Sequence, residues 1–286
     1  MYRHKPRWLR RRLPTGPTYE KVRMLLRTAR LRTVCQEAKC PNIWECFSRQ
    51  TATFLILGPH CTRGCRFCAV DKGRPRIPDP GEPARVAQTV QDMGLSYVVI
   101  TSVTRDDLPD GGARFFAKTI EKVRGKTPEA SVEVLIPDFQ DNAEALETVL
   151  QVRPQVLNHN VETVERLYPT VRPQARYHGS LELFKRAKAL DPAIPRKSGL
   201  MLGLGERAEE VEKTLDDLLN AGCSMLTLGQ YLQPSKAHLP VERFVPPEEF
   251  HEWKQRALKM GFCQVASGPF VRSSYRAKEL RDSLGD

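Results

Sequence analysis

The chain has 286 residues, of which 40% are hydrophobic and 28% are charged, an ordinary balance for a soluble globular protein. No apolar run approaches the roughly 18 residues that a membrane-spanning helix requires, and no apolar segment follows the first arginines as in a secretory signal. These features exclude membrane-spanning helices and favour a cytoplasmic protein. The length suits one large α/β domain with modest extensions, or two small domains.

The positive charge is concentrated at the N-terminus. The first 32 residues hold eleven lysines and arginines and one acid, Glu20, and therefore carry +10 of the formal net charge of +11. A basic arm of this kind indicates an acidic partner, such as nucleic acid, an anionic membrane or an acidic protein. A solvated tail without a partner is the alternative.

The predicted elements begin with a short amphipathic helix over residues 18–32, followed by a cysteine-rich loop over 35–46. Short apolar stretches rich in β-branched residues then alternate with helical patterns. The expected strands are 53–58, 97–101, 132–136, 155–159, 198–203 and 224–229. The expected helices that follow them are 82–93, 112–124, 141–150, 179–190, 207–221 and 247–260.

Six strand–helix units in succession predict a parallel sheet with right-handed crossovers. Because a closed TIM barrel needs eight such units, we expect an α/β fold of the open, partial (β/α)6 TIM-like type. We place this barrel at residues 51–262, between a basic N-terminal extension over 1–50 and a C-terminal extension over 263–286. Ligands of parallel α/β folds bind at the carboxyl ends of the strands, so the site is expected there.

The chain contains eight cysteines, and six of them fall between positions 35 and 68. Without a secretory signal, such a cluster is more typical of metal binding than of disulfides, and it indicates a reducing compartment. Cys223 and Cys263 have no partner at metal-ligand spacing. We expect both to be structural, as small hydrophobic side chains that are often buried.

Cys61, Cys65 and Cys68 form a C-x3-C-x2-C motif directly after the first predicted strand. Three thiolates on a short loop can hold three irons of a four-iron cubane, which leaves the fourth iron open to bind a substrate. Gly64 allows the loop to bend, and Phe67 is expected to shield the cluster from solvent. A zinc site that lacks one ligand, or three ordinary buried cysteines, is the alternative.

This motif, in its place after the first strand, resembles the radical S-adenosylmethionine superfamily. The resemblance implies that the open iron is chelated by the amino and carboxylate groups of S-adenosylmethionine. One electron from the reduced cluster then breaks a carbon–sulfur bond of the sulfonium, and a 5′-deoxyadenosyl radical takes hydrogen from an unactivated carbon. The protein binds and orients the cofactor and excludes water.

Two further stretches are candidates for contacts with this cofactor. Residues 199–206 have the spacing of the superfamily's G-x-I-x-G-x-x-E motif, with Met201 in the isoleucine position, and the candidates there are Gly203 and Glu206. The segment that begins with Thr101 and Ser102 departs from the Gly-Gly-Glu that usually binds the amino group of the cofactor. We assign the amino-group contacts to these two hydroxyls.

His159 ends the fourth predicted strand and is flanked by Asn158 and Asn160. Imidazole and amide groups at that edge are suited to the carboxylate or the ribose of the cofactor, and a purely structural histidine is the alternative. Asp106 and Asp107 follow the second predicted strand. They either contact the substrate or hold a loop.

Cys35, Cys40 and Cys46 form a second motif, C-x4-C-x5-C. A zinc site is the alternative here, since zinc tolerates varied ligand spacing. Upstream of C-x3-C-x2-C, however, this triplet is the paired signature of the lipoyl synthases, which the chain resembles over nearly its whole length. The stretches that carry the resemblance are VVITSVTRDDLPDGGA, VLNHNVETV, KSGLMLGLGE, LTLGQYLQPS and VASGPFVRSSY.

The resemblance implies a sulfurtransferase that inserts two sulfur atoms, at C6 and C8 of a protein-bound octanoyl group, and uses two S-adenosylmethionine molecules. The implied sulfur source is a second four-iron cluster on the upstream cysteines, so two [4Fe-4S] clusters are expected. Its implied fourth ligand is Ser273, next to Arg272 in an R-S-S-Y motif. A serine oxygen is a harder donor than a thiolate and suits a cluster that must come apart. A polar turn is the alternative.

The implied partners are an octanoylated lipoyl-carrier protein (H protein or an E2 lipoyl domain), an electron donor such as ferredoxin or flavodoxin, and an iron–sulfur carrier that rebuilds the second cluster. Neither a membrane nor nucleic acid is expected. Because the carrier is acidic in this family, the basic arm is expected to dock it. The rival interpretations are another sulfur-inserting radical enzyme, of the biotin synthase or tRNA methylthiotransferase type, and a zinc-dependent nucleic-acid-binding protein.

Overall fold

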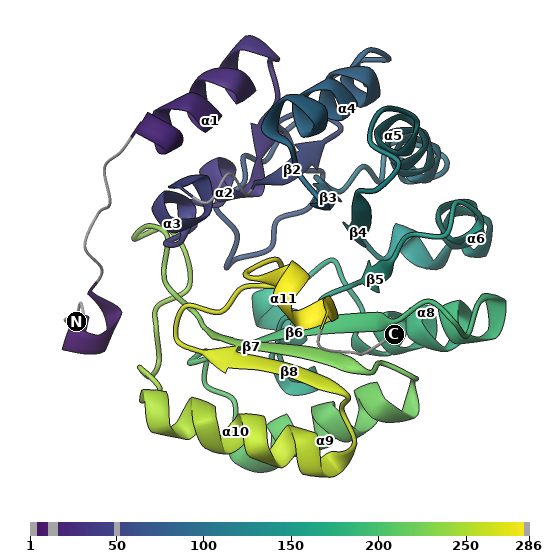
Figure 1. Cartoon of the computed structure of the whole chain (residues 1–286). Coiled ribbons are helices and arrows are strands. Elements are labelled where there is room, and N and C mark those ends of the chain that lie inside the picture. The colour runs from purple at the N-terminus through teal and green to yellow at the C-terminus, as the bar shows by residue number, and fades with distance from the viewer. Residues whose placement is uncertain (1–4, 11–16, 49–51, 283–286) are drawn as a thin grey trace.

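The computed structural model describes residues 5–10, 17–48 and 52–282 (Figure 1). Within these residues, one sheet of eight strands is hydrogen-bonded in chain order. The strands are β1 (Arg32–Thr33), β2 (Thr53–Ile56), β3 (Tyr97–Ser102), β4 (Ser131–Leu135), β5 (Val156–Asn158), β6 (Arg196–Leu202), β7 (Met225–Gln230) and β8 (Gln264–Gly268).

The sheet is parallel except at its first strand, where β1 runs antiparallel to β2. It curls around a central space, as Figure 1 shows, but within the described residues the sheet order does not pair β1 with β8. The strands are mostly buried, and the four residues of β2 are all buried. The barrel is therefore open, as the count of strand–helix units predicts.

Helices form a layer outside the sheet (Figure 1). One helix follows each of the six strands from β2 to β7, which confirms the (β/α)6 arrangement. These helices are α4 (Glu82–Met93), α5 (Ala113–Lys126), α6 (Ala143–Gln151), α8 (Tyr177–Leu190), α9 (Ala208–Asn220) and α10 (Pro247–Met260). The shorter elements are η1 (Arg7–Leu9), η2 (Phe139–Asp141), η3 (Glu165–Leu167) and α7 (Tyr168–Val171).

The structure differs from the sequence prediction mainly at the two ends of the barrel. The first helix, α1 (Pro17–Thr28), is shorter than predicted, because Arg30 adopts a left-handed φ of 52° before β1 begins. The predicted cysteine-rich loop contains two short helices, α2 (Val34–Glu37) and α3 (Ile43–Ser48). The segment assigned to the C-terminal extension begins with an additional parallel strand, β8.

Aromatic side chains join the helices of the N-terminal extension to one another. Tyr19 of α1 stacks on Trp44 of α3 at a centroid distance of 4.5 Å, and it lies 5.5 Å from the ring of Phe47. Val22 and Leu26, on the same helix, are buried in the main hydrophobic core. The extension therefore shares its core with the sheet, which places α2 and α3 beside the barrel.

The C-terminal helix α11 (Ala277–Asp282) lies within the curl of the sheet in Figure 1. Leu280 packs with Val156 and Met225, which are the first residues of β5 and β7. This contact places α11 at the amino ends of the strands, opposite the edge where ligands of such folds bind.

No helix in the described part of the chain is long and apolar enough to cross a membrane. Of the two isolated cysteines, Cys223 is buried as expected, whereas Cys263 is exposed. Cys263 immediately precedes β8, at the edge of the sheet, where its side chain meets solvent.

Candidate functional site

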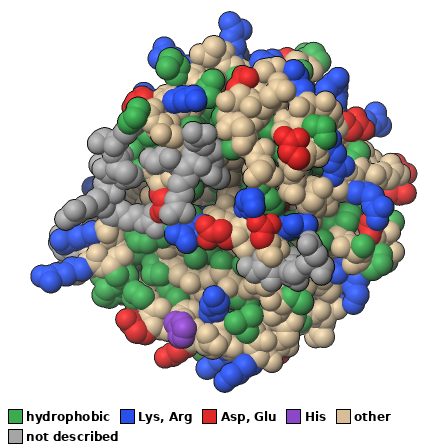
Figure 2. All heavy atoms as spheres, viewed as in Figure 1, with side chains coloured by type: hydrophobic (Ala, Val, Ile, Leu, Met, Phe, Trp, Pro, Cys, Tyr) green, Lys and Arg blue, Asp and Glu red, His purple; other side chains and the backbone are tan. Residues whose placement is uncertain are grey.

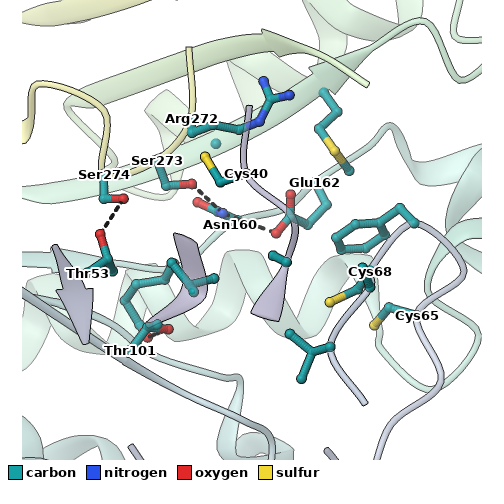
Figure 3. A pocket seen from close by; sticks show the side chains of 18 of the residues that line it. Cys40, Thr53, Cys65, Cys68, Thr101, Asn160, Glu162, Arg272, Ser273 and Ser274 are labelled. Atoms are coloured by element: carbon teal, nitrogen blue, oxygen red, sulfur yellow. Dashed lines mark hydrogen bonds between the residues drawn. The ribbon is translucent and has the colours of Figure 1, made fainter. Parts of the chain in front are cut away.

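A cavity of about 470 Å³ opens at the carboxyl ends of the strands. Both cysteine triplets line it, so the fold brings together two motifs that are separate in the sequence. The other predicted site residues in its wall are Phe67, Thr101, Ser102, His159, Asn160, Arg272 and Ser273. Figure 3 shows the wall from close by, with Cys40, Cys65 and Cys68 pointing into the same space.

The loop that carries Cys61, Cys65 and Cys68 is anchored to distant parts of the barrel. The amide of Thr62 donates to the carbonyl of Thr104 at 3.0 Å, and the amide of Arg66 donates to the carbonyl of Val171 at 3.0 Å. A histidine farther along the chain, His238, places its Nε2 atom 3.0 Å from the carbonyl oxygen of Cys68. Three separate regions therefore hold the loop.

The second triplet is held by local structure. Cys35 lies in α2, Cys46 lies in α3, and Cys40 lies between these helices. The Thr33 hydroxyl accepts a hydrogen bond from the amide of Gln36 and caps α2. The amide of Cys40 donates to the carbonyl of Cys35 at 3.0 Å, which folds the segment into a compact turn.

Burial affects the thiols of both triplets in the same direction. Desolvation raises the pKa of Cys35 to about 12 and that of Cys68 to about 12. The thiolate is the form that binds metal. Binding of iron at these positions therefore has to release protons.

The segment after β8 brings two serines to the cavity (Figure 3). The hydroxyl of Ser273 accepts a hydrogen bond from the side-chain amide Nδ2 of Asn160 at 2.5 Å. The hydroxyl of Ser274 accepts one from the hydroxyl of Thr53 at 2.8 Å. Thr53 of β2 and Asn160, two residues after the end of β5, thus position this segment.

Three contacts hold the same segment against its neighbours. The side-chain amide of Asn42 donates to the carbonyl of Phe270 at 2.7 Å, and the hydroxyl of Tyr275 donates to Glu45 at 2.9 Å. Gly229 of β7 allows the closest approach, because a Cβ atom there would lie 2.2 Å from the carbonyl oxygen of Val271. The fold therefore connects the segment of α2 and α3 to the R-S-S-Y motif.

Two of the charged residues in the cavity wall, Glu162 and Arg172, lie beside Asn160 and were not predicted from the sequence. Burial raises the pKa of Glu162, whose carboxylate accepts a hydrogen bond from Asn160 at 3.1 Å. Arg172 is buried and donates to the carbonyl oxygens of Asn160 and Val161. Glu162 stands within the quoted stretch VLNHNVETV, but Arg172 has no motif around it that would have marked it.

Some predicted site residues support the strands without entering the cavity wall. In the described part of the chain, the wall does not include Asn158, Gly203 or Glu206. The side-chain amide of Asn158 donates to the carboxylate of Glu133 at 3.2 Å, and the carboxylate of Glu206 accepts from the backbone amide of Gly203 at 2.6 Å. His159 lies in the wall, but its two ring nitrogens contact the carbonyl of Ile136 and the hydroxyl of Ser180.

The aspartates that follow β3 hold loops. Asp106 binds the guanidinium of Arg63, and Asp107 binds that of Arg105, with both oxygens of each carboxylate engaged. Asp106 thus holds the cysteine loop, and Asp107 holds an arginine of its own loop.

The cavity has the chemistry of an iron–sulfur and cofactor site. Its sulfur donors are soft ligands that suit iron. Four buried polar atoms of its wall have no hydrogen-bond partner among the described residues: Asn42 Oδ1, Ser102 Oγ, Asn160 Oδ1 and Arg172 Nε. No three Cys, His, Asp or Glu side chains of the described residues converge as a single ion would require, whereas a cubane holds its thiolates farther apart.

Two family models match the chain. The model of the radical SAM superfamily matches residues 55–218, which include the Cys61–Cys68 loop. The model of the N-terminal domain of lipoyl synthase of the Radical_SAM family matches residues 2–40, which include Cys35 and Cys40.

Curated relatives match almost the entire chain. The lipoyl synthase of Desulfotalea psychrophila is 57% identical over 276 residues, covering 96% of this chain and 92% of the relative. The lipoyl synthase of Chlorobium phaeovibrioides is 56% identical over 274 residues, covering 96% of each.

Solved structures agree in fold. HydG, a maturase of the [FeFe]-hydrogenase, superposes with a TM-score of 0.58 at 15% identity, covering 93% of this chain and 70% of HydG. Methylornithine synthase (PylB) superposes with a TM-score of 0.52 at 17% identity, covering 80% and 68%.

Proposed function

The chain belongs to the lipoyl synthase family of radical S-adenosylmethionine enzymes, and we propose that it inserts two sulfur atoms, at C6 and C8 of a protein-bound octanoyl group. The observation that supports this reaction is that both cysteine triplets line one cavity. A radical source and a sulfur source have to reach the same carbon atoms, and a shared cavity supplies that proximity. The close relatives favour this reaction over the biotin synthase, methylthiotransferase and zinc-protein interpretations.

We assign each triplet to one [4Fe-4S] cluster. Cys61, Cys65 and Cys68 hold the catalytic cluster, which with S-adenosylmethionine supplies a 5′-deoxyadenosyl radical. The upstream triplet holds the auxiliary cluster, which is consumed as the sulfur substrate. Ser273 is its fourth ligand, beside Arg272, and the hydrogen bond from Asn160 keeps that hydroxyl at the cavity wall.

The contacts with S-adenosylmethionine follow from the unpartnered polar atoms. Ser102 Oγ would hold the amino group of the cofactor and Asn160 Oδ1 one of its hydroxyls, because both atoms are buried in the wall without another partner in the described residues. Thr101 and Phe67 complete this part of the wall. The remaining predicted contacts, Asn158, His159, Gly203 and Glu206, support it through the strand ends.

The carrier of the octanoyl group is the macromolecular substrate in this proposal, and the exposed bases near the N-terminus dock it. Lys5 lines the cavity, and Arg7 and Arg10 are exposed nearby in the chain. Figure 2 shows Lys and Arg side chains projecting at its left edge, where Figure 1 places the N-terminal segment. A ferredoxin or flavodoxin supplies electrons, and an iron–sulfur carrier rebuilds the auxiliary cluster.

A sulfur-labelling experiment tests the proposal. The protein is reconstituted anaerobically with iron and heavy-isotope sulfide, freed of excess sulfide, and supplied with S-adenosylmethionine, a reductant and an octanoyl-lysine peptide. We expect the peptide to gain two heavy sulfur atoms, with two 5′-deoxyadenosine molecules formed per lipoyl group.

The matched control is a variant with alanine at Cys35, Cys40 and Cys46, which should still cleave S-adenosylmethionine but add no sulfur. If its peptide product contains sulfur, the upstream triplet does not carry the donor and the proposed reaction is wrong.

A further inference from the structure

We propose that Arg63 is a positioning residue that sets the geometry of the Cys61–Cys68 loop through a buried network with Asp106 and Asp138. The inference rests on the proposed function in that this loop binds the catalytic cluster. The inference gives a role to a side chain that lies between Cys61 and Cys65 in the sequence and is not itself an iron ligand.

All three guanidinium nitrogen atoms of Arg63 donate hydrogen bonds to carboxylate oxygens. Its Nε and Nη2 atoms donate to the two carboxylate oxygens of Asp106 at 2.7 and 2.9 Å. Its Nη1 and Nη2 atoms donate to the two oxygens of Asp138 at 2.6 and 2.6 Å. Only 6% of the residue is exposed. A planar guanidinium fits two carboxylates in this bidentate manner, and a lysine ammonium does not.

The partners of Arg63 come from two different strand ends. Asp106 follows β3, and Asp138 follows β4, where it also accepts a hydrogen bond from the amide of Gln140. The amide of Asp106 donates to the hydroxyl of Thr62, the residue next to Arg63. The network therefore ties the middle of the cysteine loop to the rim of the sheet, and the loop cannot shift without breaking it.

Electrostatics keep the network charged. Burial alone would raise the pKa of Asp138, but the Arg63 guanidinium outweighs it and lowers that pKa to about 2. One guanidinium with two carboxylates leaves a net charge of −1 beside the loop. Loss of Arg63 would leave two carboxylates facing each other with no cation between them, so the loop would be expected to move apart from the strand ends.

The chain offers a matched control in Arg105. This arginine is 1% exposed and donates two hydrogen bonds of 2.8 Å to Asp107, together with one to the carbonyl of Leu57. It is as buried as Arg63, but these three hydrogen bonds do not reach the cysteine loop. A loss of fold stability from altering a buried arginine should therefore appear at both positions. Faster loss of iron from the catalytic cluster should appear only when Arg63 is replaced.

The test compares Arg63→Lys with Arg105→Lys in the full chain, reconstituted anaerobically. The readouts are iron release to a chelator and the change that S-adenosylmethionine causes in the electron paramagnetic resonance spectrum of the reduced cluster. We expect Arg63→Lys to lose iron from the catalytic cluster about 10- to 100-fold faster, the range for supporting groups of metal ligands. Its spectrum should respond less to S-adenosylmethionine, and Arg105→Lys should behave as the parent does.

Asp106→Asn serves as a second variant if Arg63→Lys does not fold. It keeps the Asp138 contacts and replaces one charged acceptor by an amide, so an intermediate rate of iron release is expected. Thermal melting of each metal-free variant separates fold stability from cluster retention.

Equal rates of iron release from the Arg63 and Arg105 variants would overturn the inference. Iron retention equal to that of the parent in Arg63→Lys would also overturn it. Where Arg63→Lys does not fold, the same result in Asp106→Asn would do so. A parent that takes up no iron–sulfur cluster would instead contradict the proposed function.

Discussion

The two cysteine triplets line one cavity, but the chain holds them in different ways. The Cys61–Cys68 loop is bonded to strand ends and to distant segments, through contacts such as Thr62 to Thr104 and Arg66 to Val171. The Cys35–Cys46 segment is shaped by short helices and local bonds, and it meets the C-terminal segment through Asn42 and through the bond between Tyr275 and Glu45.

This difference matches the roles that we propose for the two clusters. A catalytic cluster acts repeatedly, so its ligands have to keep one geometry, and a loop fixed to a sheet provides that. A sulfur donor has to lose atoms and be rebuilt, so ligands on local turns, with a serine from another segment, allow it to open.

Replacement of Cys65 by alanine should remove catalysis. A cubane left with two thiolates on this loop loses its open-iron geometry, so cleavage of S-adenosylmethionine should fall below detection. The assay is chromatographic measurement of 5′-deoxyadenosine under reducing conditions. Cys263→Ala, at an exposed position outside the cavity wall, is the matched control and should leave the rate unchanged.

Replacement of Cys40 by alanine should separate the two triplets. We expect 5′-deoxyadenosine to form, because the catalytic loop is intact, while the lipoyl product is lost. Mass spectrometry of the octanoyl peptide checks this. Loss of both products together would mean that the two sites do not work independently. That result would contradict the separate roles proposed for the two clusters.

Ser273→Ala should slow sulfur insertion by about 10- to 100-fold, as expected for loss of a group that holds a metal centre. Ser274→Ala provides the control, because that hydroxyl is bonded to Thr53 and is not assigned to iron. Single-turnover measurement of the lipoyl product compares them. Equal rates for the two variants would contradict the assignment of Ser273 as a ligand of the auxiliary cluster.

The stability of the metal-free protein should fall as pH is lowered from about 6.5 to about 4. Burial lowers the pKa of His159 to about 4, below its ordinary 6.5, with Arg172 and Arg63 acting in the same direction and Asp138 opposing them. As pH falls, the unfolded chain therefore binds a proton before the folded chain does. The free energy of unfolding should decrease by roughly 3 kcal/mol over this interval. Urea unfolding at pH 7 and pH 4.5 measures it.

The matched variant is His159→Gln, which lacks the titrating group. It should be less stable at pH 7 but lose less stability over the same interval. An unchanged loss in the variant would assign the pH dependence to other groups.

The smallest expected effect concerns the basic residues near the N-terminus. Activity on an acidic octanoyl carrier should decrease with rising salt, because screening weakens attraction between exposed charges. Activity on a short, neutral octanoyl peptide should change little. The same salt dependence for both substrates would contradict a docking role for residues such as Arg7 and Arg10.

The sequence was sufficient for much of the fold. Periodicity located the six strand–helix units, and α4 was predicted with its observed limits, because the helix covers the core with one apolar face and ends at Gly94 in a left-handed conformation. β8 was missed because Gln264–Gly268 is short and only one of its five residues is buried. Its strand character comes from pairing with β7.

The site was predictable where chemistry is encoded in local spacing, as for the two cysteine triplets. Site residues whose roles depend on contacts between distant positions of the chain could not be predicted. Arg63 meets Asp138 across 75 positions, and Asn160 meets Ser273 across 113. No periodicity or spacing relates such pairs, so their partnership becomes visible only in the fold.

The most direct measurement is the iron and sulfide content per chain after anaerobic reconstitution, for the parent and for two triple variants with alanine at Cys35, Cys40 and Cys46 or at Cys61, Cys65 and Cys68. Two separate four-iron clusters predict about eight irons in the parent and about four in each variant. Zinc in place of iron, or a variant that keeps the iron content of the parent, would contradict the two-cluster account.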